Sequence, residues 1–221
     1  MIIALLLAAA SAAYQLLALT AALRHLAKRD PAPRALPPVS ILKPVRGLDP
    51  HFREAIRSHA LLDYAEYEVL FGVSDSADPA LPAIRELIEA FPERRLRVVE
   101  VSTQMPNGKV GALVDLAAAA RYPLLLVNDS DIRVPPDYLR RLVGPLEDPS
   151  AGLVTCLYRA RSDHWPGRWE ALGIATDFAP GVLAAPLVGV REFGLGATLL
   201  FRAADLEAIG GFAALGDYIA D

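Results

Sequence analysis

The chain has 221 residues, of which 53% are hydrophobic and 22% are charged, a globular composition with an apolar excess that needs a separate location. A formal net charge of −4 argues against a broad nucleic-acid-binding surface. The single cysteine, Cys156, excludes an internal disulfide framework and a multi-cysteine zinc site, and the four histidines lack metal-ligand spacing. A membrane-attached α/β protein remains.

The apolar excess lies at the N-terminus, where Ile2–Leu23 contains no charged side chain. A helix of this length reaches about 33 Å, enough to cross a hydrocarbon core of about 30 Å. Arg24, His25 and Lys28 follow at once, and this asymmetry predicts an N-terminus outside and the rest of the chain in the cytoplasm. A cleaved signal peptide, the alternative, has its basic residues before a shorter apolar core. We therefore expect residues 1–23 to be a membrane anchor.

Residues 24–38 are basic and rich in proline, which predicts a stiff extended linker. From residue 39 to residue 221, short apolar runs alternate with segments of helical period, which indicates one α/β domain with a mostly parallel sheet flanked by helices. The predicted strands are Val39–Leu42, Tyr67–Val73, Leu96–Val101, Leu124–Val127, Gly152–Tyr158 and Ala197–Phe201. The predicted helices are His51–Leu62, Ala80–Ala90, Val110–Ala120 and Pro136–Leu146.

Acidic side chains follow two of the predicted strands. Asp75 and Asp78 come after Tyr67–Val73, and Asp129 and Asp131 come after Leu124–Val127. Because ligands of open α/β sheets bind at the carboxyl ends of strands, these side chains form a candidate site. Carboxylates two apart in an extended segment point to the same side, so Asp129 and Asp131 can share one Mg²⁺ or Mn²⁺ with a substrate diphosphate. An acidic surface turn is the alternative.

Other common α/β sites lack support. No Gly-x-Gly-x-x-Gly follows a predicted strand, and neither a Walker sequence nor a Gly-x-Ser-x-Gly elbow is present. Dinucleotide-binding, P-loop and α/β-hydrolase interpretations therefore have no motif behind them.

Five segments, VSILKPVRGLDP, FGVSDSADPA, NGKVGAL, VNDSDIRV and the terminal GDYIAD, together resemble glycosyltransferase family 21. The similarity runs from about Val39 to Asp221 with matching order and spacing. This family includes ceramide glucosyltransferases and bacterial hopanoid-associated glycosyltransferases. The resemblance implies a GT-A-like fold preceded by one N-terminal membrane helix. It also implies an inverting transfer of sugar from a UDP-α-sugar to a lipid hydroxyl.

The resemblance also assigns roles to residues at matching positions. Asp75, Asp78, Lys109 and Asp129 match donor-nucleotide-binding positions, with Asp75 at the uridine end and Lys109 near a uracil or phosphate oxygen. Asp129 and Asp131 match a metal-binding Asp-x-Asp, for Mg²⁺ or Mn²⁺. Ceramide enzymes can carry glycine where Asp131 stands, so this residue resembles the hopanoid-associated form. For Lys109, a solvated lysine at a helix start is the alternative.

The C-terminus departs from the family pattern. The general base of the family lies in an acidic pair after a Tyr-x-Ala stretch, and here the sequence from Tyr218 reaches only the first acidic residue, Asp221. By position, Asp221 matches the neighbour of the base and is the catalytic candidate. We expect a truncated catalytic domain without the base, the Gln/Arg-x-x-Arg-Trp motif and later membrane helices. Because a general base contributes about 10²–10⁴-fold, this chain is expected to be poorly active or inactive, with its donor-binding residues retained.

Two apolar features outside the candidate site have two interpretations each. Residues 178–201 are strongly apolar but interrupted by proline and glycine, which argues against a clean membrane span. They form either a membrane-facing lip that admits a lipid acceptor or a buried loop and core strand. Trp165 and Trp169 are either interfacial anchors or, more ordinarily, core-filling side chains.

The sequence therefore predicts a membrane-anchored glycosyltransferase with a UDP-sugar donor, a lipid acceptor in the membrane and no nucleic-acid partner. From the resemblance and the bacterial composition, we expect the bacterial inner membrane, with UDP-N-acetylglucosamine as donor and a hopanoid polyol as acceptor. UDP-glucose with ceramide is the nearer rival, and transfer to a polyprenyl phosphate is the third. A non-catalytic membrane-tethered module that binds a nucleotide sugar is the rival from another class. A secreted α/β binding protein would require cleavage of the N-terminus.

Overall fold

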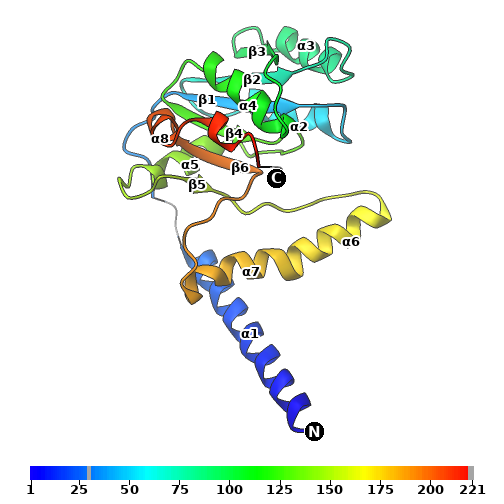
Figure 1. Cartoon of the computed structure of the whole chain (residues 1–221), viewed down its shortest axis with the longest axis vertical. Coiled ribbons are helices and arrows are strands. Elements are labelled where there is room, and N and C mark those ends of the chain that lie inside the picture. The colour runs from blue at the N-terminus through cyan, green and yellow to red at the C-terminus, as the bar shows by residue number, and fades with distance from the viewer. Residues whose placement is uncertain (29–30, 219–221) are drawn as a thin grey trace. The chain divides into compact units, whose positions relative to one another are not determined.

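The computed structural model describes residues 1–28 and 31–218 and divides into two compact units (Figure 1). Unit 1 comprises Met1–Asp30 and Leu157–Phe193, and unit 2 comprises Pro31–Cys156 and Gly194–Asp221. The segment Leu157–Phe193 is thus an excursion of the chain between two strands of unit 2.

Unit 2 contains a six-stranded sheet in the order β3-β2-β1-β4-β6-β5. The first four strands are parallel, whereas β6 runs antiparallel between β4 and β5. This confirms the mostly parallel sheet flanked by helices. Because the chain moves outward from β1 to β3 and then returns to the other side of β1, the carboxyl ends of β1 and β4 lie at a switch point of the topology. The strands are β1 (Val39–Val45), β2 (Tyr67–Val73), β3 (Arg95–Glu100), β4 (Leu124–Asn128), β5 (Val154–Thr155) and β6 (Thr198–Arg202).

Helices cover both faces of this sheet, and successive side chains of a strand point alternately to the two apolar cores. In β1, Ile41 joins the core under α2, α3 and α5, whereas Leu42 joins the core under α4 and α8. All residues of β4 are buried, as its wholly apolar start predicts. The helices are α2 (Phe52–Ala60), α3 (Leu81–Ala90), α4 (Gly108–Ala119), α5 (Tyr138–Leu146) and α8 (Ala203–Ala208), with a 3₁₀ turn, η3, at Phe212–Leu215.

One predicted strand at the edge of unit 2 is shorter than expected, and part of the predicted linker contacts unit 2. The predicted strand Gly152–Tyr158 forms only Val154–Thr155, because Leu157 and the residues after it leave the sheet for unit 1. The proline-rich residues 31–38 lie along α5 within unit 2. Glu147 accepts hydrogen bonds from the backbone N–H groups of Arg34 and Ala35 at 2.6 and 3.1 Å, and any side chain at Gly144 would collide with the carbonyl of Pro31.

Unit 1 is helical. It contains α1 (Ile2–Ala27) and a continuous helical segment made of α6 (Trp165–Gly173), a π turn, η1 (Ile174–Phe178), α7 (Ala179–Ala184) and a 3₁₀ turn, η2 (Ala185–Val188). Among the described residues, Ile2–Ala27 and Trp165–Val188 are long and apolar enough to cross a membrane by length and composition. Within the unit, α1 packs against α7, and the two buried residues of α1 are Ala18 and Ala21.

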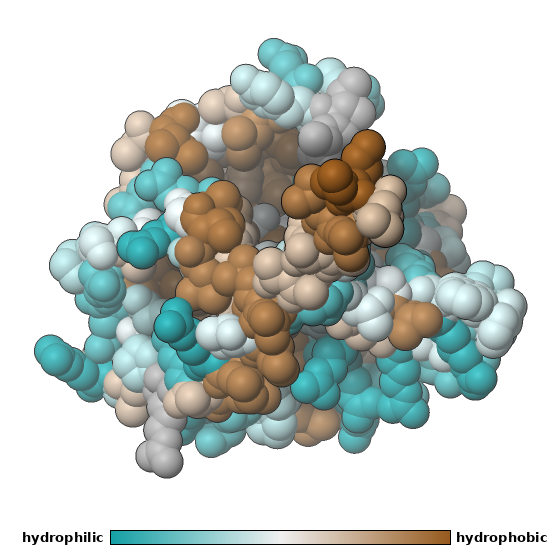
Figure 2. All heavy atoms as spheres, turned by 90° about the horizontal axis from the view of Figure 1, so that it is seen from below, coloured by the Kyte–Doolittle hydropathy of each residue, from teal (hydrophilic) through white to brown (hydrophobic). Residues whose placement is uncertain are grey.

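The tryptophans do not fill a core. Trp165 and Trp169 are 68% and 58% exposed, so the core-filling interpretation is wrong. The buried-loop interpretation of residues 178–201 holds only in part, since Ala184, Leu200 and Phe201 are buried whereas Val188 and Val190 are exposed. Figure 2 shows many hydrophobic residues at the surface.

Candidate functional site

The loops after β1, β2 and β4 carry the predicted acidic residues at the carboxyl ends of the strands. Asp78 is only 8% exposed, and both its carboxylate oxygens accept backbone hydrogen bonds, from Gly47 at 2.9 Å and from Ala80 at 2.8 Å. It therefore ties the loop after β1 to the loop after β2. Asp75 is exposed and accepts a hydrogen bond from the N–H of Ala77, so it is the member of this pair that can reach a ligand.

Asp129 and Lys109 come together although they lie on different elements. Lys109 is in the first turn of α4, and its Nζ lies 2.6 Å from Asp129 Oδ1, with each side chain about one-third exposed. The helix start is fixed by Asn107, whose side-chain oxygen accepts hydrogen bonds from the N–H groups of Lys109 and Val110. The ammonium thus neutralises a carboxylate at the point where a cation or a phosphate is expected.

Asp131 lies two residues further along the same loop. Partial desolvation of its carboxyl raises its pKa, and the like charges of Asp129 and Asp49 add to the rise, against the charge of Lys43. A bound cation would relieve this repulsion. The described residues contain no cluster of three or more metal-ligating side chains, but two carboxylates with open positions for substrate phosphates fit Mg²⁺ or Mn²⁺.

A buried lysine contacts the loop that carries Asp129 and Asp131. Lys43 of β1 is fully buried, and its Nζ donates to the side-chain oxygen of Asn128 at 2.5 Å and to the carbonyl of Asp129 at 2.7 Å. Burial lowers the pKa of Lys43 to about 7, despite the nearby charges of Asp129 and Asp131. Lys43 therefore fixes the backbone of the residue that carries the first metal-binding carboxylate.

The network continues on both sides of Lys43. Its Nζ lies 3.4 Å from Nε2 of His59, and Nδ1 of this histidine lies 3.0 Å from the carbonyl of Ala55. These contacts assign the proton to Nδ1 and leave Nε2 as the acceptor. Burial, with the charge of Lys43, lowers the pKa of His59 well below its usual value.

Asn128 connects this lysine to the antiparallel strand. Its amide nitrogen donates to Tyr138 Oη at 3.2 Å and to the carbonyl of Ala197 at 3.0 Å, and Tyr138 Oη lies 2.8 Å from Thr198 Oγ1. The last residue of β4 is thereby held by α5 and β6 immediately before the acidic loop. Such satisfied buried networks rigidify the groups that they contain.

Sequence reasoning missed Lys43, His59 and Asp49. A lysine in the middle of an otherwise apolar predicted strand is the signal that was available for Lys43, because a buried lysine needs partners. Asp49 also follows a strand, β1, and lies in one of the segments that carry the family resemblance.

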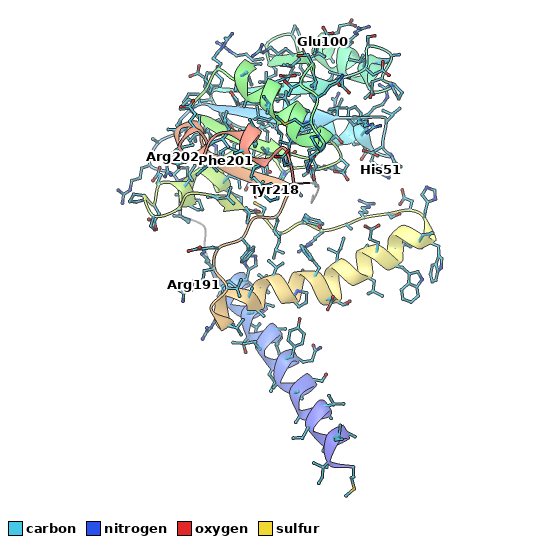
Figure 3. All side chains as sticks on the ribbon, in the orientation of Figure 1. His51, Glu100, Arg191, Phe201, Arg202 and Tyr218 are labelled. Carbon is cyan, nitrogen blue, oxygen red and sulfur yellow. The ribbon has the colours of Figure 1, made fainter. Side chains whose placement is uncertain are left out.

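The C-terminal part of the described chain also reaches the start of α4. The side-chain amide of Asn107 donates to the carbonyl of Tyr218 at 3.1 Å, so the residue that orders the backbone at Lys109 also holds the chain near its end. Figure 3 labels Tyr218 below the sheet, near the end of the described chain. The remaining candidate, Asp221, lies outside the described residues.

A family assignment has to explain three features of unit 2. These are a mostly parallel sheet, an acidic pair at its switch point and a lysine beside that pair. The family model described as glycosyl transferase family 21 matches residues 3–221. The chain belongs to glycosyltransferase family 21. This confirms the resemblance found in the sequence.

Curated relatives in this family are longer than this chain. It is 27% identical over 202 residues to ceramide glucosyltransferase 1 of Caenorhabditis elegans, and the match covers 90% of this chain and 42% of that protein. It is 34% identical over 111 residues to ceramide glucosyltransferase 3 of the same species, over 50% of this chain and 24% of that protein. The chain thus spans less than half the length of these relatives.

Solved structures support the same fold. A mannosyltransferase from Pyrobaculum calidifontis, in complex with GDP-Man and Mn²⁺, matches with a TM-score of 0.66 and 26% identity, over 93% of this chain and 56% of that chain. S. aureus TarS in complex with UDP-GlcNAc matches with a TM-score of 0.52 and 16% identity, over 77% of this chain and 46% of that chain, a likeness of fold alone.

Proposed function

We propose that this chain carries the donor-binding part of an inverting glycosyltransferase that moves a sugar from a UDP-sugar to a lipid hydroxyl. The observation that carries the proposal is the pairing of Lys109 with Asp129, two residues before Asp131, at the switch point of a family 21 fold. We assign the catalytic role to residues 39–221, the anchor to residues 1–23 and the linker to residues 24–38.

In this proposal Asp129 and Asp131 hold Mg²⁺ or Mn²⁺, which when bound neutralises charge on the departing diphosphate. Lys109, which pairs with Asp129, would bind a phosphate oxygen or the uracil of the donor with its ammonium. Asp75 binds near the uridine, and Asp78 holds the two loops that frame the nucleotide. The acceptor hydroxyl attacks the anomeric carbon from the face opposite the leaving diphosphate, and its proton passes to a base next to Asp221.

For the substrates, we propose UDP-N-acetylglucosamine and a hopanoid polyol in the bacterial inner membrane, with the N-terminus outside. Asp131 supports this choice through the resemblance. The second candidate is glucosyl transfer from UDP-glucose to ceramide, which the similarity to the C. elegans relative favours. A membrane-tethered module that only binds the nucleotide sugar is the alternative of another class.

Calorimetry of UDP binding to the detergent-solubilised chain, with Mn²⁺ and then with EDTA, tests the donor site. We expect metal-dependent binding that is lost in the Asp129→Asn, Asp131→Asn double variant and kept in Asp137→Asn, an exposed aspartate at the start of α5. Circular dichroism establishes that each variant is folded. Absence of binding by the folded wild-type chain contradicts the proposal.

Competition between UDP-N-acetylglucosamine and UDP-glucose then separates the two donors. Transfer to a hopanoid polyol or to ceramide, measured with labelled donor, separates the acceptors. Binding without transfer by a chain extended beyond Asp221 would favour the non-catalytic module.

A further inference from the structure

One face of α6 is apolar and exposed. Trp165, Trp169 and Leu172 are spaced by four and three residues, so they lie on one side of the helix, and they are 68%, 58% and 49% exposed. We call these three residues the tryptophan face. The two indole rings contact each other edge to face, with centroids 5.6 Å apart. Glu170, which is also exposed, points away from this face because each residue turns the helix by about 100°.

We propose that the helical segment Trp165–Val188 lies along the membrane–water interface, with the tryptophan face in the lipid, and does not cross the bilayer. The proposal rests on the proposed function only in requiring that α1 span the membrane. Tryptophan prefers this interface because its ring is apolar and its N–H is polar.

The connections of the segment exclude a single crossing that leaves Val188 on the far side of the membrane. On either side of the excursion, Thr155 and Leu195 are joined by a hydrogen bond, in which the N–H of Leu195 donates to Thr155 Oγ1 at 2.9 Å. The chain must therefore return to the side from which it left. Only residues 189–194 lie between Val188 and Leu195, and fully extended they reach about 21 Å, less than the hydrocarbon core of about 30 Å.

The contact with α1 sets a depth that agrees with an interfacial position. The buried residues of α1, Ala18 and Ala21, lie three and six residues before Arg24, the first charged residue after the apolar segment. Along a helix axis this is about 4.5 to 9 Å. Amphipathic helices at interfaces bury their apolar face about 5–10 Å into the boundary between headgroups and acyl chains. Because α7 packs against α1, it reaches this layer together with α1.

The charges of the segment indicate which kind of membrane surface it meets. Residues 157–193 contain four arginines and four acidic residues, with one histidine, so they carry no formal net charge. Attraction to anionic lipids is therefore weak, and burial of apolar and aromatic surface provides the binding. We infer that a zwitterionic phosphatidylcholine bilayer is sufficient.

The protein supplies its own reporter, because Trp165 and Trp169 are its two tryptophans. The full chain is reconstituted into phosphatidylcholine vesicles with and without lipids brominated at shallow or deep acyl positions. We expect blue-shifted tryptophan emission, strong quenching by the shallow bromines, weaker quenching by the deep bromines, and little quenching by aqueous iodide. Trp165→Phe and Trp169→Phe each leave one tryptophan as reporter. Both variants are expected to show the same order of quenching: strongest by shallow bromines, weaker by deep bromines and least by iodide.

A matched pair of variants tests the face itself. Leu172→Glu places a charge on the tryptophan face and is expected to shift the emission to the red and raise the quenching by iodide. Glu170→Gln, on the other side of α6, is expected to leave both unchanged. Full access to iodide without bromine quenching overturns the proposal, as does protection from both quenchers, which would indicate a protein partner. Stronger quenching by deep than by shallow bromines overturns it in favour of a membrane-inserted segment. UDP binding is measured separately, so a result that overturns the interfacial position of α6 does not bear on the proposed donor site.

Discussion

At the scale of single residues, the candidate site depends on a buried lysine, Lys43, that touches no solvent. Lys43 donates to Asn128 and to the carbonyl of Asp129, and loss of these donors leaves one buried and one partly buried acceptor unpaired. Unpaired buried polar groups cost about 1–3 kcal/mol each. The effect falls on the backbone that orients the proposed metal ligands, so stability and donor binding are coupled at this residue.

We therefore expect Lys43→Met to lower both the free energy of unfolding and the affinity for UDP with Mn²⁺. Ser40→Ala is the matched control, because Ser40 is also a fully buried residue of β1, but it bonds to Glu68 at 2.7 Å, away from the acidic loop. This variant is expected to lose stability by about 1 kcal/mol and to keep its UDP affinity. Equal loss of affinity in both variants would show that Lys43 acts only through general stability.

His59 predicts a dependence of stability on pH. Its pKa in the folded chain lies well below 6.5, whereas in the unfolded chain it is about 6.5. As the pH falls below 6.5, the unfolded state takes up a proton that the folded state does not, so the free energy of unfolding decreases by up to about 1.4 kcal/mol per pH unit.

We expect denaturant titrations from about pH 7.5 to about pH 5 to show this decrease in the wild type and a shallower one in His59→Gln. His164→Gln, at an exposed position in unit 1, is the control and is expected to follow the wild type. A wild-type and a His59→Gln chain with the same slope would contradict the assignment of a neutral, buried histidine.

At the scale of elements, α4 is positioned by the loop after β3. The carboxylate of Asp115 accepts hydrogen bonds from the N–H groups of Ser102 and Thr103 at 2.6 and 2.9 Å, and from Thr103 Oγ1 at 2.6 Å. It thereby holds the loop after β3 against the helix. Gly111 allows this approach, since a Cβ there would lie 2.6 Å from the carbonyl oxygen of Thr103.

We expect Gly111→Ala to push α4 away from this loop, which would destabilise the chain by about 1–3 kcal/mol and move Lys109 relative to Asp129. Gly108→Ala is the control in the same helix, because nothing lies within 4 Å of a Cβ at that position. It is expected to be neutral or to stabilise by up to about 1 kcal/mol. Thermal unfolding and UDP calorimetry measure both effects, and an unaffected Gly111→Ala variant would contradict them.

At the scale of the whole molecule, the basic residues after the apolar part of α1 predict the orientation of the chain in the membrane. Arg24 and Lys28 favour the cytoplasmic side, together with everything that follows. We expect protease added outside spheroplasts to leave residues 31–221 intact, and trypsin added to inverted vesicles to cleave them.

The double variant Arg24→Gln, Lys28→Gln removes two of the four Lys and Arg charges between residues 24 and 34 and is expected to give a mixed orientation, whereas Arg46→Gln, an exposed residue of unit 2, is expected to change nothing. Cleavage of the wild-type chain by protease added outside the spheroplasts would contradict the proposed topology.

Much of the fold and part of the site could be predicted from local patterns. The alternation of apolar runs with helical periods was sufficient for the parallel strands and for α2 to α5. Strands buried on both faces appear as continuous apolar runs, and helices that pack on one side show a helical period. The position of Asp75, Asp129 and Asp131 after strands followed from the same patterns. The length of α1 could be predicted from its uninterrupted run of apolar residues.

The tertiary structure alone decided which of these residues bear on one another. Lys43 and His59 are buried by chain segments far apart in the sequence, and Asp78 is committed to backbone N–H groups of two loops. Trp165 and Trp169 are exposed because their segment leaves the sheet between β5 and β6. The hydrophobic period of a segment indicates which of its side chains face the core. Whether a polar or aromatic side chain is buried depends on which distant segments pack against it.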